Sequence, residues 1–199
     1  PSNWSLNTVP TSSDDIVISS NGTYAPVIDT DVTISAGKSL TITSTSSAGS
    51  GSLTIAPGKI LTIAGSADFG TRPVTFKSDI TGTGMFGQLT GILLRATNVV
   101  VERYIPAKRA WRLLTAPLKG SSNNTVGTNW QGTANEGLLL FSPATYQSTA
   151  MTGYTTGGVR TNIWKYNSAS TQWQSITDIS AENLFSLNVN NGFLVFATG

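Results

Sequence analysis

The segment "VTISAGKSLTITS", from Val32 to Ser44, is written almost a second time as "LTIAPGKILTIAG", from Leu53 to Gly65. The offset between the two copies is 21 residues, and a further step of 21 reaches "VTF", Val74 to Phe76. A fixed period near twenty residues is typical of proteins that stack one structural repeat on the next. The repeat therefore decides the fold prediction for this part of the chain.

Aliphatic and hydroxyl side chains alternate within each copy. Leu40 and Ile42 fall on one side of an extended segment, and the residues between them are polar. Because successive side chains of a strand point to opposite faces, this alternation predicts half-buried β-strands. The other inward positions of the repeat are Val32, Ile34, Leu53, Ile55, Leu61, Ile63, Val74 and Phe76.

A tight turn joins the two strands of each copy. In "APGK", Pro57 and Gly58 occupy the positions that a type II turn favours, and Gly37 holds the same place in "SAGK". Equivalent strands recur one whole period later, which predicts the coils of a short parallel β-solenoid with a period of 21. That arrangement requires Leu40 to lie directly over Leu61 in the next coil.

The chain divides into two predicted domains. Residues 1–105 form the solenoid, with "DDIVISS" (14–20) as its first coil and "TNVVVERYI" (97–105) as its last. Residues 106–199 lose the repeat and gain aromatic residues between turn-rich segments, which predicts an antiparallel β-sandwich-like domain. The fold class is all-β. We expect the second domain to be truncated, because its last predicted strand reaches the chain end.

The composition excludes several classes of function. Only 11% of the 199 residues are charged, the net charge is +2, and the sequence contains neither Cys nor His. Disulfides, thiolate metal sites and Ser-His-Asp catalysis are therefore excluded. The Lys and Arg residues form no basic stripe, so we predict no nucleic-acid partner. No apolar run is long enough to span a bilayer.

The polar residues of the chain are mainly Ser, Thr, Asn and Gly, which favours an extracellular protein. The first residues, "PSNWS", lack the charged start and apolar core of a signal peptide. For a secreted protein this predicts a mature or trimmed chain.

The segment "NWSLNTVPTSSDDIVISS", followed by "YAPVI" and two "GK-L-T-I" coils, resembles the repeat region of large secreted cell-surface proteins of Bacteroidetes. The later segments "VVVERYIPAKRAWRLLTAPLKG", "NIWKYNSASTQWQSITD" and "NGFLVFATG" are similar to those that follow such coils. The resemblance covers almost the whole chain. In that family the final segment runs on through a Gly-Asp-Arg-type ending, so a chain that stops at Gly199 is expected to be a fragment or a trimmed product.

The resemblance implies export by the type IX secretion route and an adhesin-like or scaffold role at the cell surface. The family carries its sorting signal in a C-terminal domain that this sequence does not contain. The resemblance also implies neighbouring domains in a longer chain, and it supplies no catalytic residue.

Two glycine motifs have familiar enzymatic counterparts. "GTGMFG", from Gly82 to Gly87, matches the dinucleotide fingerprint, with Glu102 at the acidic position. The fingerprint needs a helix after the third glycine, and the β-branched residues that follow favour a turn between coils instead. "DFG", Asp68 to Gly70, matches the kinase magnesium motif but lacks the rest of a kinase. We predict a turn there as well and expect no cofactor.

Four aspartates near the first coil leave open a calcium site or a pair of catalytic carboxylates: Asp14, Asp15, Asp29 and Asp31. Each pair supplies too few ligands for calcium, and no second carboxylate follows one period later. We predict no metal site and no catalytic residue. The threonines Thr33, Thr54 and Thr75 are expected to form an outward column, which is typical of half-exposed strands and, in longer regular arrays, of ice binding.

Aromatic residues of the second domain carry the remaining functional signal. Five lie in or near polar, turn-rich segments: Trp130, Tyr146, Tyr154, Trp164 and Trp173. Aromatic rings beside Asn and Gln suit the C–H faces and hydroxyls of sugars, although a small β-domain also needs aromatic core residues. We select Trp130 and Tyr154 as surface positions that bind a ligand.

The sequence therefore predicts a non-enzymatic extracellular surface protein, an adhesin or structural scaffold, whose partners are glycans or cell-surface components. The alternative is a carbohydrate-active protein, either a sugar-binding module or a fragment of a polysaccharide lyase or hydrolase.

Overall fold

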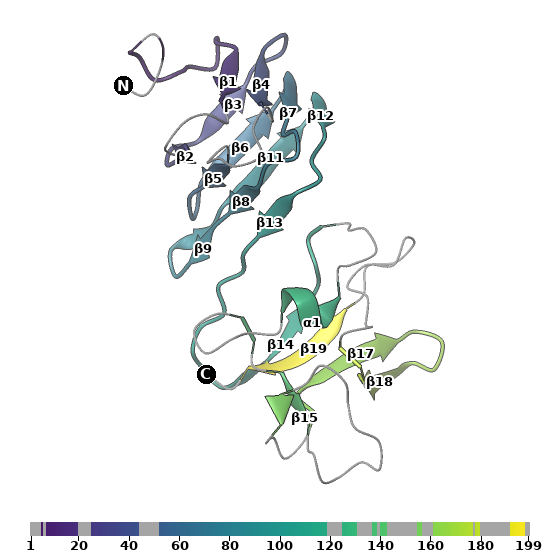
Figure 1. Cartoon of the computed structure of the whole chain (residues 1–199). Helices are drawn as coiled ribbons and strands as arrows, with labels where there is room; N and C mark the ends of the chain where they lie inside the picture. Colours follow the sequence, from purple (N-terminus) through teal and green to yellow (C-terminus); the bar gives the residue numbers. More distant parts are fainter. Residues whose placement is uncertain are drawn as a thin grey trace. The chain divides into compact units, whose positions relative to one another are not determined.

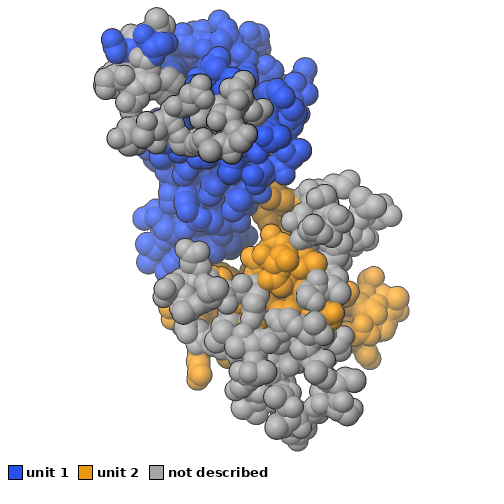
Figure 2. Space-filling view, in the orientation of Figure 1, with its two compact units in different colours: residues 1–104 blue, residues 105–199 orange. Residues whose placement is uncertain are grey.

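The computed structural model describes residues 5, 7–19, 25–43, 52–118, 125–130, 137–138, 140–142, 155–156, 161–176, 178–179 and 192–197. Nearly every regular element in these ranges is a β-strand, and the one α-helix among them has four residues. The predicted all-β class is confirmed. Two compact units divide the chain, Pro1–Tyr104 (unit 1) and Ile105–Gly199 (unit 2), which Figure 2 colours separately.

The described residues of unit 1 form three parallel sheets and one small hairpin (Figure 1). The first sheet has the order β1-β4-β7-β12, with strands Ile16–Ile18, Ser39–Ile42, Ser66–Asp68 and Ile92–Leu94. The second has the order β3-β6-β11, with strands Val32–Ile34, Ile60–Ile63 and Met85–Leu89. The third has the order β2-β5-β8-β13, with strands Val27–Ile28, Leu53–Ile55, Val74–Phe76 and Val99–Val101. The antiparallel hairpin pairs β9 (Ser78–Asp79) with β10 (Gly82–Thr83).

The chain visits the three sheets in turn. After β5 it forms β6 in the second sheet and β7 in the first, and it then returns to the third sheet with β8. Each strand therefore pairs in parallel with a strand of the same sheet one circuit later, as β5 does with β8. We call each such circuit a turn of unit 1.

The inward residues of the three sheets form one apolar core. Leu40, Ile42, Leu61 and Ile63 are each at most 3% exposed, as the alternation predicts. The same core contains Ile34, Leu53, Ile55, Ala67, Phe69, Val74 and Phe76, together with Ile16 and Ile18 of β1. Phe86 of β11 packs against Phe76 with a ring separation of 5.1 Å.

The predicted stacking of Leu40 on Leu61 is wrong. Leu40 pairs with Ala67 in the first sheet, whereas Leu61 pairs with Val32 in the second. The offset between paired residues is 21 only for β5 and β8, where Leu53 pairs with Val74. Elsewhere it lies between 24 and 29 residues.

The prediction fails because each turn has three sides, one strand in each sheet. Strands of two of these sides have similar sequences. The first copy of the repeat forms β3 and β4, and the second copy forms β5 and β6. The two copies therefore occupy different pairs of sheets. The third side, β7, reads Ser-Ala-Asp and places only Ala67 in the core, so it does not resemble the Leu and Ile strands. The threonines follow the same pattern: Thr54 pairs with Thr75, but Thr33 pairs with Thr62.

Glycines allow the backbones of successive turns to approach at the corner between the second and first sheets. A Cβ atom on Gly65 would lie 2.1 Å from the carbonyl oxygen of Lys38, and one on Gly91 would lie 1.8 Å from the carbonyl oxygen of Gly65. Neither distance is compatible with a side chain. The backbone amides of both glycines are used, because Gly65 donates to Ile34 and Gly91 donates to Ile63.

Unit 2 contains a four-stranded antiparallel sheet with the order β14-β19-β17-β18. Its strands are Ala110–Leu114, Phe193–Ala197, Ile163–Asn167 and Gln172–Ser175. The other elements in the described part of unit 2 are the helix α1 (Val126–Asn129) and the parallel pair β15 (Phe141–Ser142) and β16 (Thr155–Thr156). The apolar core of unit 2 contains Val126, Leu140, Ile163, Ile176, Ile179, Phe193 and Val195.

Gly91→Ala is expected to destabilise unit 1 by about 3 kcal/mol, because the new methyl group forces the backbones of two turns apart. Chemical denaturation followed by circular dichroism measures the change. Gly192→Ala is the control, since a Cβ atom there meets nothing within 4 Å. Equal stability of the two variants would contradict the close approach at the corner.

Candidate functional site

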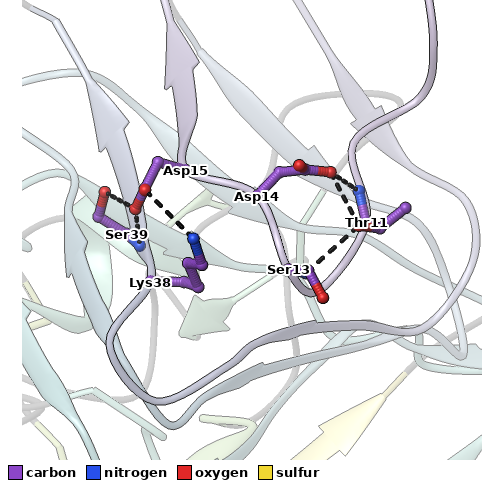
Figure 3. A network of polar contacts seen from close by, with 6 residues as sticks. All are labelled: Thr11, Ser13, Asp14, Asp15, Lys38 and Ser39. Atoms are coloured by element: carbon purple, nitrogen blue, oxygen red, sulfur yellow. Dashed lines mark hydrogen bonds and ion pairs between the residues drawn. The ribbon is translucent and has the colours of Figure 1, made fainter.

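The two aspartates before β1, Asp14 and Asp15, contact polar groups of unit 1 (Figure 3). Asp15 accepts hydrogen bonds from the backbone N–H and the hydroxyl of Ser39, both at 2.8 Å, and lies 3.7 Å from the ammonium of Lys38. Asp14 accepts hydrogen bonds from the N–H and the hydroxyl of Thr11, both at 2.8 Å. The two neighbouring carboxylates point to different partners.

Asp15 occupies the position of a backbone acceptor. In the first sheet, the N–H of Ser66 donates to the carbonyl of Lys38, the residue before β4, at 2.8 Å. One turn earlier the N–H of Ser39 donates to the side chain of Asp15, the residue before β1. The carboxylate thus replaces a carbonyl of the ladder at the edge strand of the sheet.

The second sheet uses the same replacement. Its edge strand, β3, is preceded by Asp31, whose carboxylate accepts a hydrogen bond from the N–H of Ile60 at 3.0 Å. One turn later the N–H of Met85 donates to the backbone carbonyl of Lys59 at 2.8 Å. Asp15 and Asp31 therefore serve one structural purpose, the attachment of the two edge strands.

These hydrogen bonds set the acidity of the carboxyl groups. The hydroxyl of Ser39, followed by its backbone N–H, lowers the pKa of Asp15 below its usual value, and Lys38 adds a smaller attraction. The backbone N–H of Thr11, followed by its hydroxyl, lowers the pKa of Asp14. A glycosidase acid needs a raised pKa to donate its proton near neutral pH. The pKa values of Asp14 and Asp15 are instead lowered, which does not suit a proton donor.

The other motifs with enzymatic counterparts are also parts of strands and corners. Gly82 lies in β10, and Gly87 lies in the middle of β11, so no helix begins after the third glycine of "GTGMFG". Asp68 of "DFG" ends β7 and forms a bidentate ion pair with Arg95, which lowers the pKa of Asp68. Within the described residues, no group of three His, Cys, Asp or Glu side chains is placed to hold a metal ion.

The candidate binding surface lies on the four-stranded sheet of unit 2. Residues directly opposite one another in antiparallel strands share a face of the sheet. Phe193 and Val195, which are fully buried, define the inner face. The pairs on the other side are Trp111–Phe196, Leu113–Leu194, Trp164–Leu194 and Tyr166–Trp173. We call these seven residues the aromatic face: Trp111, Leu113, Trp164, Tyr166, Trp173, Leu194 and Phe196.

Much of the aromatic face is accessible to solvent. The exposed fraction is 50% for Trp111, 74% for Leu113, 45% for Tyr166 and 42% for Trp173. The sheet thus has apolar residues on both faces, one covered by the core of unit 2 and one open. A contiguous exposed apolar surface of this kind is typical of a binding site.

The rings of the aromatic face pack at steep angles to one another. Trp111 lies 5.0 Å from both Trp164 and Phe196, measured between ring centroids, with interplanar angles of 60° and 57°. Tyr166 and Trp173 lie 5.3 Å apart at 64°. The Tyr166–Trp173 contact is edge-to-face and the two contacts of Trp111 are tilted, and such contacts fix the ring orientations. The exposed surface of the aromatic face is therefore uneven, and its rings do not lie in one plane.

Of the two residues that the sequence selected as ligand-binding, the structure describes only Trp130. Trp130 follows α1, is half-buried, and packs edge-on against Phe193 at 5.2 Å as part of the core of unit 2. Its position on the inner side separates it from the aromatic face. Tyr154 falls outside the described residues. The ligand-binding role of both stays a prediction.

Trp111 and Tyr166 are functional candidates that the sequence did not indicate, and Trp173 was only one of five aromatic candidates. The signal was present in "AWRLL" and "IWKYN", where apolar residues fall on both faces of a short strand. Such strands belong to a sheet with two apolar faces.

None of three comparisons finds a match for this chain, whether with protein-family models, with curated proteins or with solved structures. The resemblance to secreted surface proteins therefore stays a prediction. No helix among the described residues is long and apolar enough to cross a membrane.

Asp15→Asn is expected to make the stability of unit 1 less dependent on pH in the acidic range. A carboxylate with a lowered folded pKa stabilises the fold above its unfolded pKa of about 3.9, and the contribution is lost as the pH falls through the folded pKa. Thermal unfolding between about pH 5 and pH 2 should show a smaller decrease for Asp15→Asn than for the wild type. The exposed Thr30, changed to Ala, alters no titratable group; it is the control and should keep the wild-type slope. Identical slopes for all three proteins would refute this role of Asp15.

Trp130→Ala is expected to destabilise unit 2 by about 2–3 kcal/mol, because it removes a half-buried ring from the core. Trp173→Ala, on the exposed edge strand, should cost less than about 1 kcal/mol. Urea denaturation followed by far-UV circular dichroism, which requires no tryptophan signal, compares the two. A larger loss for Trp173→Ala would contradict the assignment of the inner and outer faces.

Proposed function

We propose that the chain is a non-enzymatic extracellular surface protein, in which unit 1 is a rigid spacer and unit 2 makes the contact. In this proposal unit 1 is a short parallel β-solenoid with three strands per turn, and unit 2 is a β-sandwich-like domain. The single observation that carries the proposal is the pairing order of unit 1, in which strands from successive turns follow one another in three parallel sheets.

The outward side chains of unit 1 support a role as a spacer. The central strands carry Thr and Ser outside, including Thr41, Thr54, Thr62 and Thr75. Stacked turns resist bending because each is hydrogen-bonded to its neighbours along three sheets. A rigid element whose central strands carry uncharged polar groups outside suits the separation of a binding domain from a cell surface.

The acids of the first turn support a non-enzymatic role. Asp14, Asp15 and Asp31 are each engaged by a backbone N–H, and the first two have lowered pKa values. Export by the type IX route is part of the proposal and rests on the family resemblance alone.

A sugar-binding module is the second candidate function, and the aromatic face favours it. Trp and Tyr rings combine an apolar face with a hydrogen-bonding group, which matches the alternating C–H and hydroxyl surfaces of sugars. The two functions are compatible, because a surface protein can adhere through glycans.

Antibodies raised against the 199-residue chain are expected to label intact cells of the source organism or to detect the protein in the medium. A cytoplasmic enzyme, detected with its own antibody in the same samples, is the control for cell lysis. Detection of the protein only in the cytoplasmic fraction would overturn the extracellular role.

The non-enzymatic role has its own test. Purified protein incubated with neutral and acidic polysaccharides should release neither reducing ends nor unsaturated products. Turnover that disappears in Asp14→Ala and Asp15→Ala would replace the proposal with the lyase or hydrolase alternative.

A further inference from the structure

We infer that the aromatic face of unit 2 binds a single chain of a neutral polysaccharide. This deepens the sugar-binding function proposed above and rests on it.

The aromatic face carries no charged side chain. The four strands of the sheet contain two basic residues, Arg112 and Lys165, and no acidic residue. Arg112 pairs with Val195 and Lys165 pairs with Phe193, so both lie on the inner face. A charged polymer on the aromatic face would lose hydration without gaining a partner charge. Charge complementarity therefore selects a neutral ligand over an acidic polysaccharide or a nucleic acid.

The exposed rings lie on different strands of the sheet. Trp111 is on β14, and Trp173 is on β18, three strand spacings away in the order β14-β19-β17-β18. With a spacing of roughly 4.8 Å, the face extends about 14 Å across the strands. A ligand that touches both ends must be extended, as an oligosaccharide is, and larger than one sugar ring.

The ring angles distinguish a single chain from a crystalline surface. Neighbouring rings are tilted by 57° to 64°, so they do not present one plane. A crystalline polysaccharide offers a flat surface and would meet few of them. A free chain can rotate about its glycosidic bonds and place successive sugars on differently inclined rings.

The hairpin between β17 and β18 supplies hydrogen-bonding groups without charge. Residues 167–175 read "NSASTQWQS" and contain Asn, Gln, Ser and Thr around Trp173. Ser175 pairs with Trp164, so it lies on the same face as Trp173, and it is exposed. An uncharged hydroxyl next to an exposed ring matches the hydroxyl groups at the edge of a sugar.

Binding to soluble xylan, mixed-linkage β-glucan, galactomannan and starch tests the inference, with polygalacturonate, alginate and single-stranded DNA as the charged polymers. Affinity electrophoresis screens the panel, and isothermal titration calorimetry follows for any ligand found. We expect at least one neutral polysaccharide to bind, with little dependence on salt. Trp111→Ala and Trp173→Ala should each weaken binding at least tenfold.

Gln174→Ala is the matched control, because Gln174 neighbours Trp173 on the same strand but pairs with Lys165 on the other face. It should weaken binding less than threefold. Circular dichroism establishes that each variant is folded. Retained binding in both tryptophan variants would overturn the assignment of the site.

Three other outcomes would also overturn the inference. They are preference for a charged polymer, failure to bind any neutral polysaccharide of the panel, and a dimer that Trp111→Ala and Trp173→Ala dissociate in sedimentation velocity. None of them bears on cell-surface labelling, which tests the extracellular role separately. A failure of this inference is thus distinguishable from a failure of the proposed surface location.

Discussion

The parallel hydrogen-bond ladder between successive turns is the constraint on which unit 1 depends. A single turn cannot bury its aliphatic residues, because they become enclosed only when the next turn pairs with it. The ladder brings Leu53 beside Val74 and Leu61 beside Val32, so residues more than twenty positions apart share one core. Local preferences select the strands, but pairing between turns makes them stable.

The same constraint explains the polar residues at the ends of the ladder. At the start of the strands that pair with β1 and β3, the N–H groups of Ser39 and Ile60 each need an acceptor from the edge strand. Asp15 and Asp31 supply that acceptor from their side chains. On the opposite edges, Arg95 pairs with Asp68 and Glu102 pairs with Lys77, in each case linking the last strand to the turn before it. Asp15, Asp31, Asp68 and Glu102 are thus attachments between turns.

The sequence allowed the core of unit 1 to be predicted but not the stacking of its turns. Alternation in "SLTI" and "ILTI" is a local property, so Leu40, Ile42, Leu61 and Ile63 could be assigned to the interior. Stacking depends on how many sides each turn has. The side formed by β7 has Ala67 as its inward residue between Ser66 and Asp68, and no hydrophobic pattern marks it as a strand.

The candidate site was harder to predict for a related reason. Trp111 and Arg112 are neighbours on one strand, and only pairing with β19 decides which of them faces the core. In β19 itself every residue is apolar, so the sequence does not distinguish its two faces. The hydrogen bond from Ser39 to Asp15 joins residues 24 apart, and no local motif indicates it.

The corners of unit 1 differ in the freedom they leave for change in the sequence. At the corner of Gly65 and Gly91 the backbones of successive turns are in direct contact. An added side chain or an extra residue there would disrupt the pairing between turns. Between β8 of the third sheet and β11 of the second, the chain instead forms the hairpin of β9 and β10, and β11 still pairs with β6. Foreign peptides could therefore be grafted at the tip of that hairpin, around Ile80, which is 80% exposed, while the glycine corner would have to be kept intact.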